Sequence, residues 1–227
     1  MLHAKILTLP GLLVLLAGVS LQLLLGSPTC ADGLQDDVDQ AVGILKRFEE
    51  IPEQSVPPAV LKNAKGLAIF TVAKAGFVLS ARGGTGVVVA RTDSGWSGPS
   101  AIGIGGGGFG LQIGAQVSEL VVVLNTEKAL QAFGRGGNVS LGADLSVAAG
   151  PIGRDAAIDV LPQAAVYTYS RSQGLFAGVS LEGTVIASRD ETNQTYYGKP
   201  VSPQEILSGA VSPPPGAQKL LEALANR

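Results

Sequence analysis

Residues 66–92 read GLAIFTVAKAGFVLSARGGTGVVVART, and residues 100–125 read SAIGIGGGGFGLQIGAQVSELVVVLN. Short runs of Val, Ile, Leu and Phe are separated there by glycine, and the stretch between them, DSGWSGP at 93–99, is rich in turn residues. Apolar runs of this length, bounded by Gly, Ser, Asp and Pro, are typical of β-strands joined by tight turns. Residues 67–125 are therefore predicted to form antiparallel strands.

Two helices are predicted before these strands. Apolar residues recur at spacings of three and four from Leu34 to Phe48, which is the period of one helix face. A short helix is predicted from Pro58 to Lys65, because Pro suits a first helical turn and Gly66 suits the position after the C-cap.

Strands and short helices alternate in the rest of the chain. Thr126 is predicted to cap a brief helix, EKALQAF, at 127–133. Strand-like stretches lie at 138–150, 164–172, 174–183 and 184–190, and helical stretches at 203–210 and 216–225. With no internal repeat and no long linker, we expect one α+β domain. It is Gly-rich, with a largely antiparallel, strongly bent β-sheet or partial barrel flanked by the N-terminal amphipathic helix and short C-terminal helices.

The first 31 residues are predicted to be a signal peptide. Residues 6–26 contain no charge and follow Lys5, which is the order of an export signal. We expect cleavage after Ala31, which leaves a domain at 32–227 in the periplasm or outside the cell, peripheral to a membrane. Two alternatives stay open: the apolar run is long enough to remain as an uncleaved anchor, and Cys30 could instead be lipidated.

The only Cys and the only His limit the chemistry of the mature chain. Cys30 and His3 both precede residue 32, so a chain that begins at Asp32 contains neither residue type. This excludes Cys/His zinc sites, thiol nucleophiles, His-dependent triads and disulfides. We expect no metal, no cofactor and no catalytic activity. A net charge of −2 gives no general attraction to nucleic acid.

Several long motifs, in order along the chain, resemble the SYLF domain. They are KGLAIFTVAKAGFVLSARGGTGVVVART, GWSGPSAIGIGGGGFGLQIGAQ, VVVLNTEKAL, LSVAAGPIGRDA, YSRSQGLFAGVSLEGTVI and YYGKPVSPQEILSG. They cover the chain from about Leu34 to its end, and it is identified as a bacterial exported member of that family. The resemblance implies a domain that binds phosphoinositides or other anionic phospholipids, with actin binding added in fungal members such as the yeast actin-patch proteins.

The resemblance also implies a role for the N-terminal helix. In eukaryotic members an amphipathic helix with a basic polar face contacts lipid. Here the helix at 34–50 departs from that pattern, since its acids, Asp36, Asp37, Asp39, Glu49 and Glu50, outnumber Lys46 and Arg47. Actin is not expected as a partner of an exported chain.

A local excess of positive charge marks the candidate lipid-binding residues. No acid lies between Glu53 and Asp93, and this interval contains Lys62, Lys65, Lys74, Arg82 and Arg91. If these side chains share one surface, each contributes about 1 kcal/mol near an anionic bilayer. The alternative is that they are solvated ends of strands and helices that face different directions.

Trp96 is the sixth candidate lipid-binding residue. It lies beside the predicted turn at 93–99. It is either an anchor at the level of lipid headgroups or a lid over one end of the core.

Two further patterns suggest other functions. Gly103, Gly105 and Gly108 have the spacing of a dinucleotide-binding loop, but the residues that follow alternate as in a strand, so a glycine-lined strand is predicted. The acids Glu119, Asp144, Asp155, Asp159 and Glu182 could suggest a hydrolytic pair. Nothing in the sequence fixes their separation, so turn-capping or solvated positions are predicted.

The predicted function is therefore an exported, non-catalytic module that contacts anionic phospholipid or phosphoinositide headgroups through a basic surface. The alternative is a structural or protein-interaction module of the envelope without specific lipid binding.

Overall fold

A computed structural model of the 227-residue chain describes residues 33–50, 55–76, 79–109, 114–150, 164–174 and 184–225. The predicted signal peptide at 1–31 lies outside these ranges, as does the predicted strand at 174–183 apart from its first residue. The proposed cleavage, anchoring and lipidation near Cys30 therefore stay predictions.

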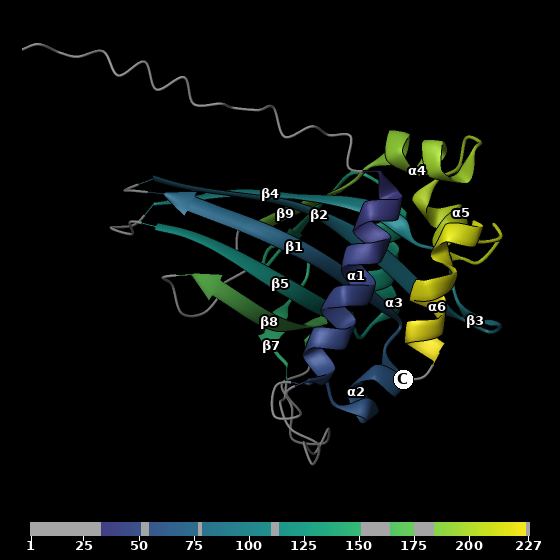
Figure 1. Ribbon diagram of the computed structural model, residues 1–227, viewed down its shortest axis with the longest axis horizontal. Coiled ribbons are helices and arrows are strands. Elements are labelled where there is room, and N and C mark those ends of the chain that lie inside the picture. The colour runs from purple at the N-terminus through teal and green to yellow at the C-terminus, as the bar shows by residue number, and fades with distance from the viewer. Residues whose placement is uncertain are drawn as a thin grey trace, which may run out of the picture. The chain divides into compact units, whose positions relative to one another are not determined.

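A nine-stranded sheet forms the centre of the fold (Figure 1). Its strands are β1 (Gly66–Gly76), β2 (Leu79–Thr92), β3 (Gly95–Trp96), β4 (Ser100–Phe109), β5 (Gly114–Leu124), β6 (Asn138–Leu141), β7 (Val147–Ala149), β8 (Val166–Gly174) and β9 (Thr184–Ser188). The order is β6-β9-β4-β2-β1-β5-β8-β7, with β3 paired to β2. All of these pairs are antiparallel except β7–β8, which is parallel.

The sheet curls into a half-barrel. β6 and β7 lie at opposite ends of the strand order, yet only residues 142–146 separate them, and Leu141 forms a bridge with Leu145. Buried side chains from seven strands join one cluster on the inner face, including Phe70, Val88 and Leu120. The two helices α3 (Glu127–Gly134) and α5 (Pro203–Leu207) add Ala129, Phe133 and Leu207 to this inner core.

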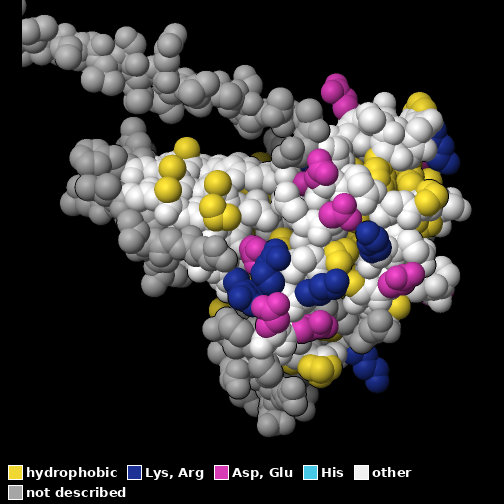
Figure 2. All heavy atoms as spheres, in the orientation of Figure 1, with side chains coloured by type: hydrophobic (Ala, Val, Ile, Leu, Met, Phe, Trp, Pro, Cys, Tyr) yellow, Lys and Arg dark blue, Asp and Glu magenta, His cyan; other side chains and the backbone are white. Residues whose placement is uncertain are grey.

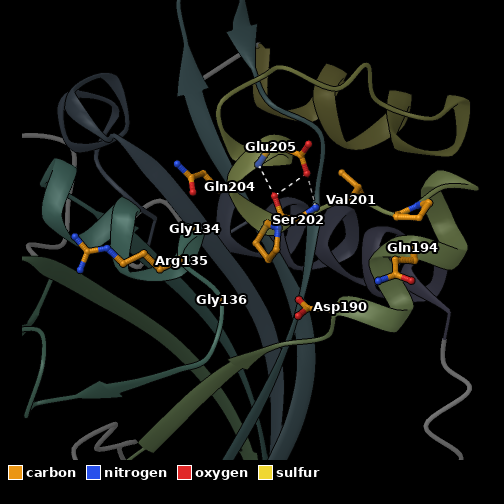
Figure 3. A pocket seen from close by; sticks show the side chains of 11 residues that line it. Gly134, Arg135, Gly136, Asp190, Gln194, Val201, Ser202, Gln204 and Glu205 are labelled. Carbon is orange, nitrogen blue, oxygen red and sulfur yellow. Dashed lines mark hydrogen bonds between the residues drawn. The ribbon is translucent and has the colours of Figure 1, made fainter.

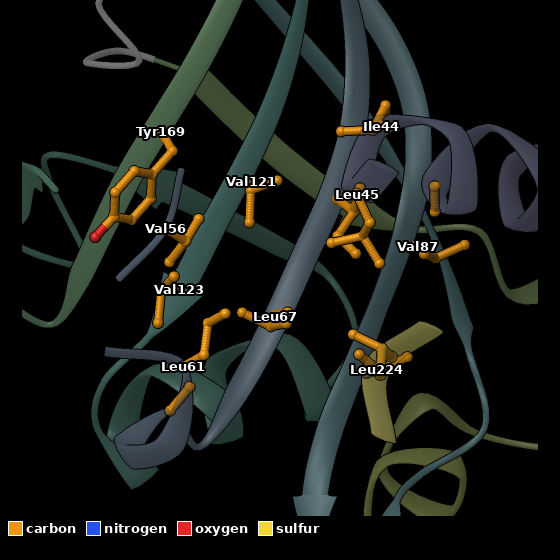
Figure 4. Close-up of a cluster of buried hydrophobic side chains, with 14 of the residues drawn as sticks. Ile44, Leu45, Val56, Leu61, Leu67, Val87, Val121, Val123, Tyr169 and Leu224 are labelled. Atoms are coloured by element: carbon orange, nitrogen blue, oxygen red, sulfur yellow. The ribbon is translucent and has the colours of Figure 1, made fainter. Parts of the chain in front are cut away.

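Three helices cover the outer face and form a second core (Figure 4). They are α1 (Leu34–Glu49), α2 (Pro58–Asn63) and α6 (Gln218–Ala225). Alternation along β1 sends Leu67 and Ile69 to this outer core and Ala68 and Phe70 to the inner one. The strands β1, β2 and β5 are therefore buried on both faces where the helices lie.

A buried ion pair fixes α1 on the sheet. Asp37 is fully buried and accepts hydrogen bonds from Arg189 Nη1 and Thr85 Oγ1, each at 2.6 Å. Arg189 begins α4 (Asp190–Tyr197) as its N-cap residue, so the pair joins α1, β2 and the β9–α4 junction. Asp37, an acid in the first turn of α1, is thus a packing residue.

Two glycines bring β1 and β2 close together. A Cβ on Gly84 would overlap the Thr71 carbonyl, and one on Gly86 would overlap the Ile69 carbonyl. Only glycine lacks the atom that would collide, so the sequence ARGGTG permits this close approach of β2 to the backbone of β1.

The predicted α+β fold with a bent, largely antiparallel sheet is confirmed, with differences at the ends of some elements. The helix that begins at Pro58 ends at Asn63, not Lys65, because Ala64 is extended and Lys65 N already donates to Leu124 O of β5. Gly66 is therefore the first residue of β1 rather than a helix terminator. The helix α4 was not predicted.

The predicted cap of α3 is confirmed. Thr126 Oγ1 accepts the Ala129 N–H at 3.1 Å.

Candidate functional site

Three of the predicted cationic residues lie at the end of the hairpin β1–β2 next to α2. Lys62 is exposed on α2, and Lys65 Nζ lies 3.1 Å from Glu127 Oε1. The Arg91 backbone N–H donates to Lys65 O at 2.8 Å, and Arg91 Nη2 donates to Leu61 O at 3.0 Å. Lys62, Lys65 and Arg91 thus form one group, which we call the α2-end group.

Trp96 belongs to this end of the molecule and packs against the outer core. Its ring is half-buried against the outer core, and its Nε1 donates to Leu224 O at 3.2 Å. The Arg91 guanidinium lies 4.1 Å from the ring centroid, a cation–π contact. The side chain is held by α6 and Arg91, which fits the lid interpretation of the sequence.

Lys74 and Arg82 form a second group at the other end of the hairpin. They are directly opposite each other in the β1–β2 register and point to the inner face. Arg82 Nη1 donates to Thr184 Oγ1 at 3.2 Å, and the neighbour of Lys74 on β5 is Gln116. Thr184 and Gln116 are both buried, so the inner face changes here from apolar to polar and cationic.

The expectation that all five cations share one surface is wrong in its geometry. Lys74 is eight residues beyond Gly66 along β1, which corresponds to about 26 Å. Arg82 and Arg91 are nine residues apart on β2, an odd number, so they point to opposite faces. The cations therefore form two groups, and whether either one binds lipid stays a prediction.

Among the described residues, the outer face beside Lys74 and Arg82 is exposed, and its two outermost rows contain no charged side chain. Two aligned rows of small or apolar residues cross the sheet there, and we call them the sheet tip. The first row is Val117, Ala73, Gly83, Gly105 and Val185, and the second is Ala115, Ala75, Ala81 and Gly107. Val117 is 49% exposed and Val185 36%, and they are the exposed large hydrophobic residues of the described chain.

The space-filling view shows the same contrast (Figure 2). Acidic and basic side chains gather over the helix-covered part of the outer face, whereas the strand ends beyond it are yellow and white. The sheet tip is thus two-sided: apolar outside, cationic inside. Sequence reasoning listed the cations but missed the apolar rows, although the alternation of Ala73, Ala75 and Ala81 with Lys74 and Arg82 was a signal for them.

A polar pocket of about 560 Å³ lies between the end of α3 and the start of α5 (Figure 3). Arg135 and Asp190 line it, together with the capping box of α5, in which Glu205 N donates to Ser202 Oγ and Ser202 N donates to Glu205 Oε2. The backbone N–H and the hydroxyl of Ser202 lower the pKa of Glu205. These two side chains are accounted for by helix capping.

The other sequence patterns have structural explanations. Gly103, Gly105 and Gly108 lie within β4, as the strand interpretation predicted, so no loop-to-helix phosphate site forms there. Asp144 caps a turn by accepting from Ser140 N at 2.7 Å. Glu119 pairs with Arg47 at 2.7 Å.

The remaining acids, Asp155, Asp159 and Glu182, lie outside the described residues. Within the described ranges, no group of three or more His, Cys, Asp and Glu side chains is placed to hold a metal ion. None of the helices that the structure describes is long and apolar enough to cross a bilayer.

Residues 105–227 match a family model, Ysc84, which is described as "Las17-binding protein actin regulator". Close relatives cover most of the chain. The SH3 domain-containing YSC84-like protein 1 of Bos taurus is 46% identical over 199 residues, which is 84% of this chain and 58% of the relative.

The chain belongs to the Ysc84, or SYLF, family.

Other members of the Ysc84 family show similar sequence identity and coverage. The Xenopus laevis SH3 domain-containing YSC84-like protein 1 is 48% identical over 200 residues, 84% of this chain and 60% of the relative. Protein YSC84 of Saccharomyces cerevisiae is 44% identical over 204 residues, 86% of this chain and 44% of the relative. The chain thus spans from 44% to 60% of the length of these relatives. No solved structure matches it.

In this Ysc84-family chain, α1 does not offer an apolar face to a membrane. Its apolar residues, among them Leu34, Val38, Leu45 and Phe48, are buried in the outer core. Its outward side carries Asp36 and Asp39. The lipid-contacting helix that the resemblance implies for eukaryotic members is therefore not available here unless α1 leaves the core.

Proposed function

We propose that the chain is a non-catalytic module that binds membranes containing anionic phospholipids, and that the sheet tip is the part that contacts them. The observation that carries this proposal is the two-sided character of the tip. Val117 of β5 and Val185 of β9 lie in an uncharged outer row, while Lys74 and Arg82 lie on the inner face of β1 and β2, which the same row crosses.

This arrangement combines the two signals that reversible membrane binding requires. Shallow insertion of the small apolar face contributes a hydrophobic term, and each nearby Lys or Arg adds about 1 kcal/mol at an anionic surface. The hydrophobic term is small, because the two rows consist mostly of Ala and Gly. The electrostatic term from two cations is also small. Together they favour an anionic bilayer over a neutral one.

The size of the tip argues against a second copy of the chain as the occupant. The first row crosses five strands, which at about 4.8 Å per strand makes it about 20 Å wide, and the two rows together cover on the order of 200 Å². A stable protein dimer buries about 800 Å² on each partner. A fluid bilayer needs no such area.

Vesicle co-sedimentation tests the proposal. The full chain should sediment with phosphatidylcholine vesicles that contain phosphatidylglycerol, should not do so with phosphatidylcholine alone, and should be released by salt. Replacing both tip cations (K74Q with R82Q) should weaken partitioning about 30-fold, since about 2 kcal/mol is removed.

The matched control is Lys62→Gln, at the exposed α2-end group, which should leave partitioning unchanged. An outer-row variant, Ala73→Asp, places a charge where insertion is expected and should weaken binding without disturbing the core, because Ala73 is exposed. The proposal is wrong if binding is absent, is insensitive to salt, or survives both tip variants.

Protein binding is the second candidate function, and the family description favours it. That description names a Las17-binding actin regulator, and a curated relative is named LAS seventeen-binding protein 3. We do not expect actin as the partner, because the apolar sequence at 6–26 favours export. A pull-down with the full chain, in parallel with the vesicle assay, separates the two: stoichiometric capture of one protein partner without vesicle binding would select the second candidate.

A further inference from the structure

The helix α1 forms a wall along the sheet tip on the outer face of the sheet. It crosses the strands between the tip and α6 (Figure 1). Near its start, Asp37 accepts a hydrogen bond from Thr85 of β2, and near its end, Arg47 pairs with Glu119 of β5. Thr85 and Glu119 are each two residues from the first row of the tip along their strands. The wall therefore runs directly beside that row.

One side of α1 faces the tip. The residues on this side, which recur at spacings of three and four, are Asp36, Gln40, Gly43 and Arg47. Together with Asp39 they line a hollow of about 440 Å³. On the other side of the helix, Gln35 donates to the carbonyl of Gly216, two residues before α6. The hollow thus lies in the angle between α1 and the sheet tip.

The sheet tip has the dimensions of one helix. Its two rows lie two residues apart along each strand, which is about 6.6 Å. Packed helices lie about 8–10 Å from each other, so a helix laid beside α1 would rest on both rows. The width of about 20 Å corresponds to about 13 helical residues. The Ala and Gly residues of the rows let a helix approach closely, and Val117 and Val185 would contact its two ends.

The exposed charge of the wall is acidic near the start of α1. Asp36 and Asp39 are exposed there, and Asp39 also accepts from Gln35 Nε2 at 3.3 Å. The charge of Arg47 is matched by Glu119 at 2.7 Å. Basic side chains near Asp36 would complement this end of the wall. A helix antiparallel to α1 would place its last turn here, where Lys and Arg also interact favourably with its own dipole.

We propose that the sheet tip and the adjacent side of α1 form a docking groove for an amphipathic helix of a partner protein, with basic residues in the last turn of that helix. Its apolar face would cover the two rows of the tip. The proposal does not rest on membrane binding, but both use the same rows, so a docked helix would exclude a bilayer from them. Such a partner would regulate the proposed membrane contact by competition.

A synthetic helix tests the groove. The assay contains no vesicles, because basic amphipathic helices also bind anionic lipid. The probe is a stapled peptide of about 16 residues, slightly longer than the tip is wide, with Ala and Leu on one face and lysines in its last turn. The full chain should bind it saturably in fluorescence anisotropy. A control peptide with glutamates in place of the lysines should bind about tenfold more weakly. Equal affinity for the two peptides, or binding of neither, would overturn the proposal.

Two variants and a control test the named residues. Ala73→Gln places a long side chain in the middle of the first row and should abolish binding, and the fold should tolerate it because Ala73 is exposed. Asp36→Asn should weaken the lysine peptide about three- to fivefold without weakening the glutamate peptide. Glu222→Gln, an exposed acid of α6 beyond the other side of α1, should bind like the original chain. Unchanged binding by both Ala73→Gln and Asp36→Asn would contradict the proposal.

The groove and the membrane function can fail independently. Peptide binding without sedimentation on phosphatidylglycerol vesicles supports the groove and rejects the membrane contact, and vesicle binding without peptide binding does the reverse. The double variant K74Q/R82Q separates them further. Lys74 and Arg82 point to the inner face, so this variant should keep peptide binding while losing anionic vesicles.

Discussion

The two ends of β1 lie in different environments, although they belong to one continuous strand. From Gly66 to Phe70 every residue is buried, with helices on the outer face and the inner core behind. From Ala73 to Gly76 the outward residues Ala73 and Ala75 are exposed and Lys74 is half-buried. The first half of the strand therefore holds the fold together, and the second half is a surface presented by it. A change at the packed end should cost stability, and the same change at the tip should not.

The largest contrast is expected from truncating one large side chain at each end. Phe70→Ala empties a fully buried position of the inner core and should lower the free energy of unfolding by about 3–5 kcal/mol. Val117→Ala removes a side chain that is 49% exposed and should change it by about 0.5 kcal/mol or less. Urea denaturation of both variants measures the difference. Similar losses in the two would mean that the tip is part of the cooperative core.

A second contrast concerns the attachment of α1. Asp37→Ala leaves Arg189 without its buried carboxylate partner and should cost about 3 kcal/mol, since breaking one side of a buried pair strands the other charge. Asp36→Ala, one residue earlier and exposed, should cost about 0.5 kcal/mol or less. Thermal unfolding of the two variants measures the two losses of stability. An equally mild effect of both would show that packing alone holds α1.

The elements that the sequence predicted well are those with a hydrophobic period. α1 shows the three–four spacing, and β1, β2 and β5 show dense Val, Ile and Leu runs, so both cores could be anticipated. α4 lacks such a period. Its buried residue is Asn193, which accepts the Ala101 N–H and donates to Ser100 Oγ. A helix that packs through a polar side chain gives no apolar pattern to detect.

The candidate site was predictable in composition but not in geometry. Counting charges between Glu53 and Asp93 found Lys74 and Arg82, yet only the hairpin register makes them cross-strand neighbours. That Arg91 lies on the opposite face from Arg82 could have been predicted from the alternation of β2 alone, because an odd number of residues along a strand reverses the face. The packing of Trp96 depends on Leu224 of α6, which is 128 residues away in sequence, and local patterns contain no information about that contact.

The smallest contrast compares two glycines on neighbouring strands. Gly84→Ala would place a Cβ against the Thr71 carbonyl, so β1 and β2 must separate, and the variant should lose about 1–3 kcal/mol. Gly105, in the outer row of the tip, has no atom within 4 Å of an added Cβ and no positive φ. Gly105→Ala should therefore be neutral or slightly stabilising, because alanine restricts the unfolded chain more than glycine does. Denaturant midpoints for both variants test this. If Gly105→Ala lost as much unfolding free energy as Gly84→Ala, the exposed outer row would have to be packed against a partner in solution. Vesicle binding by the Gly105 variant would then show whether that partner competes with lipid.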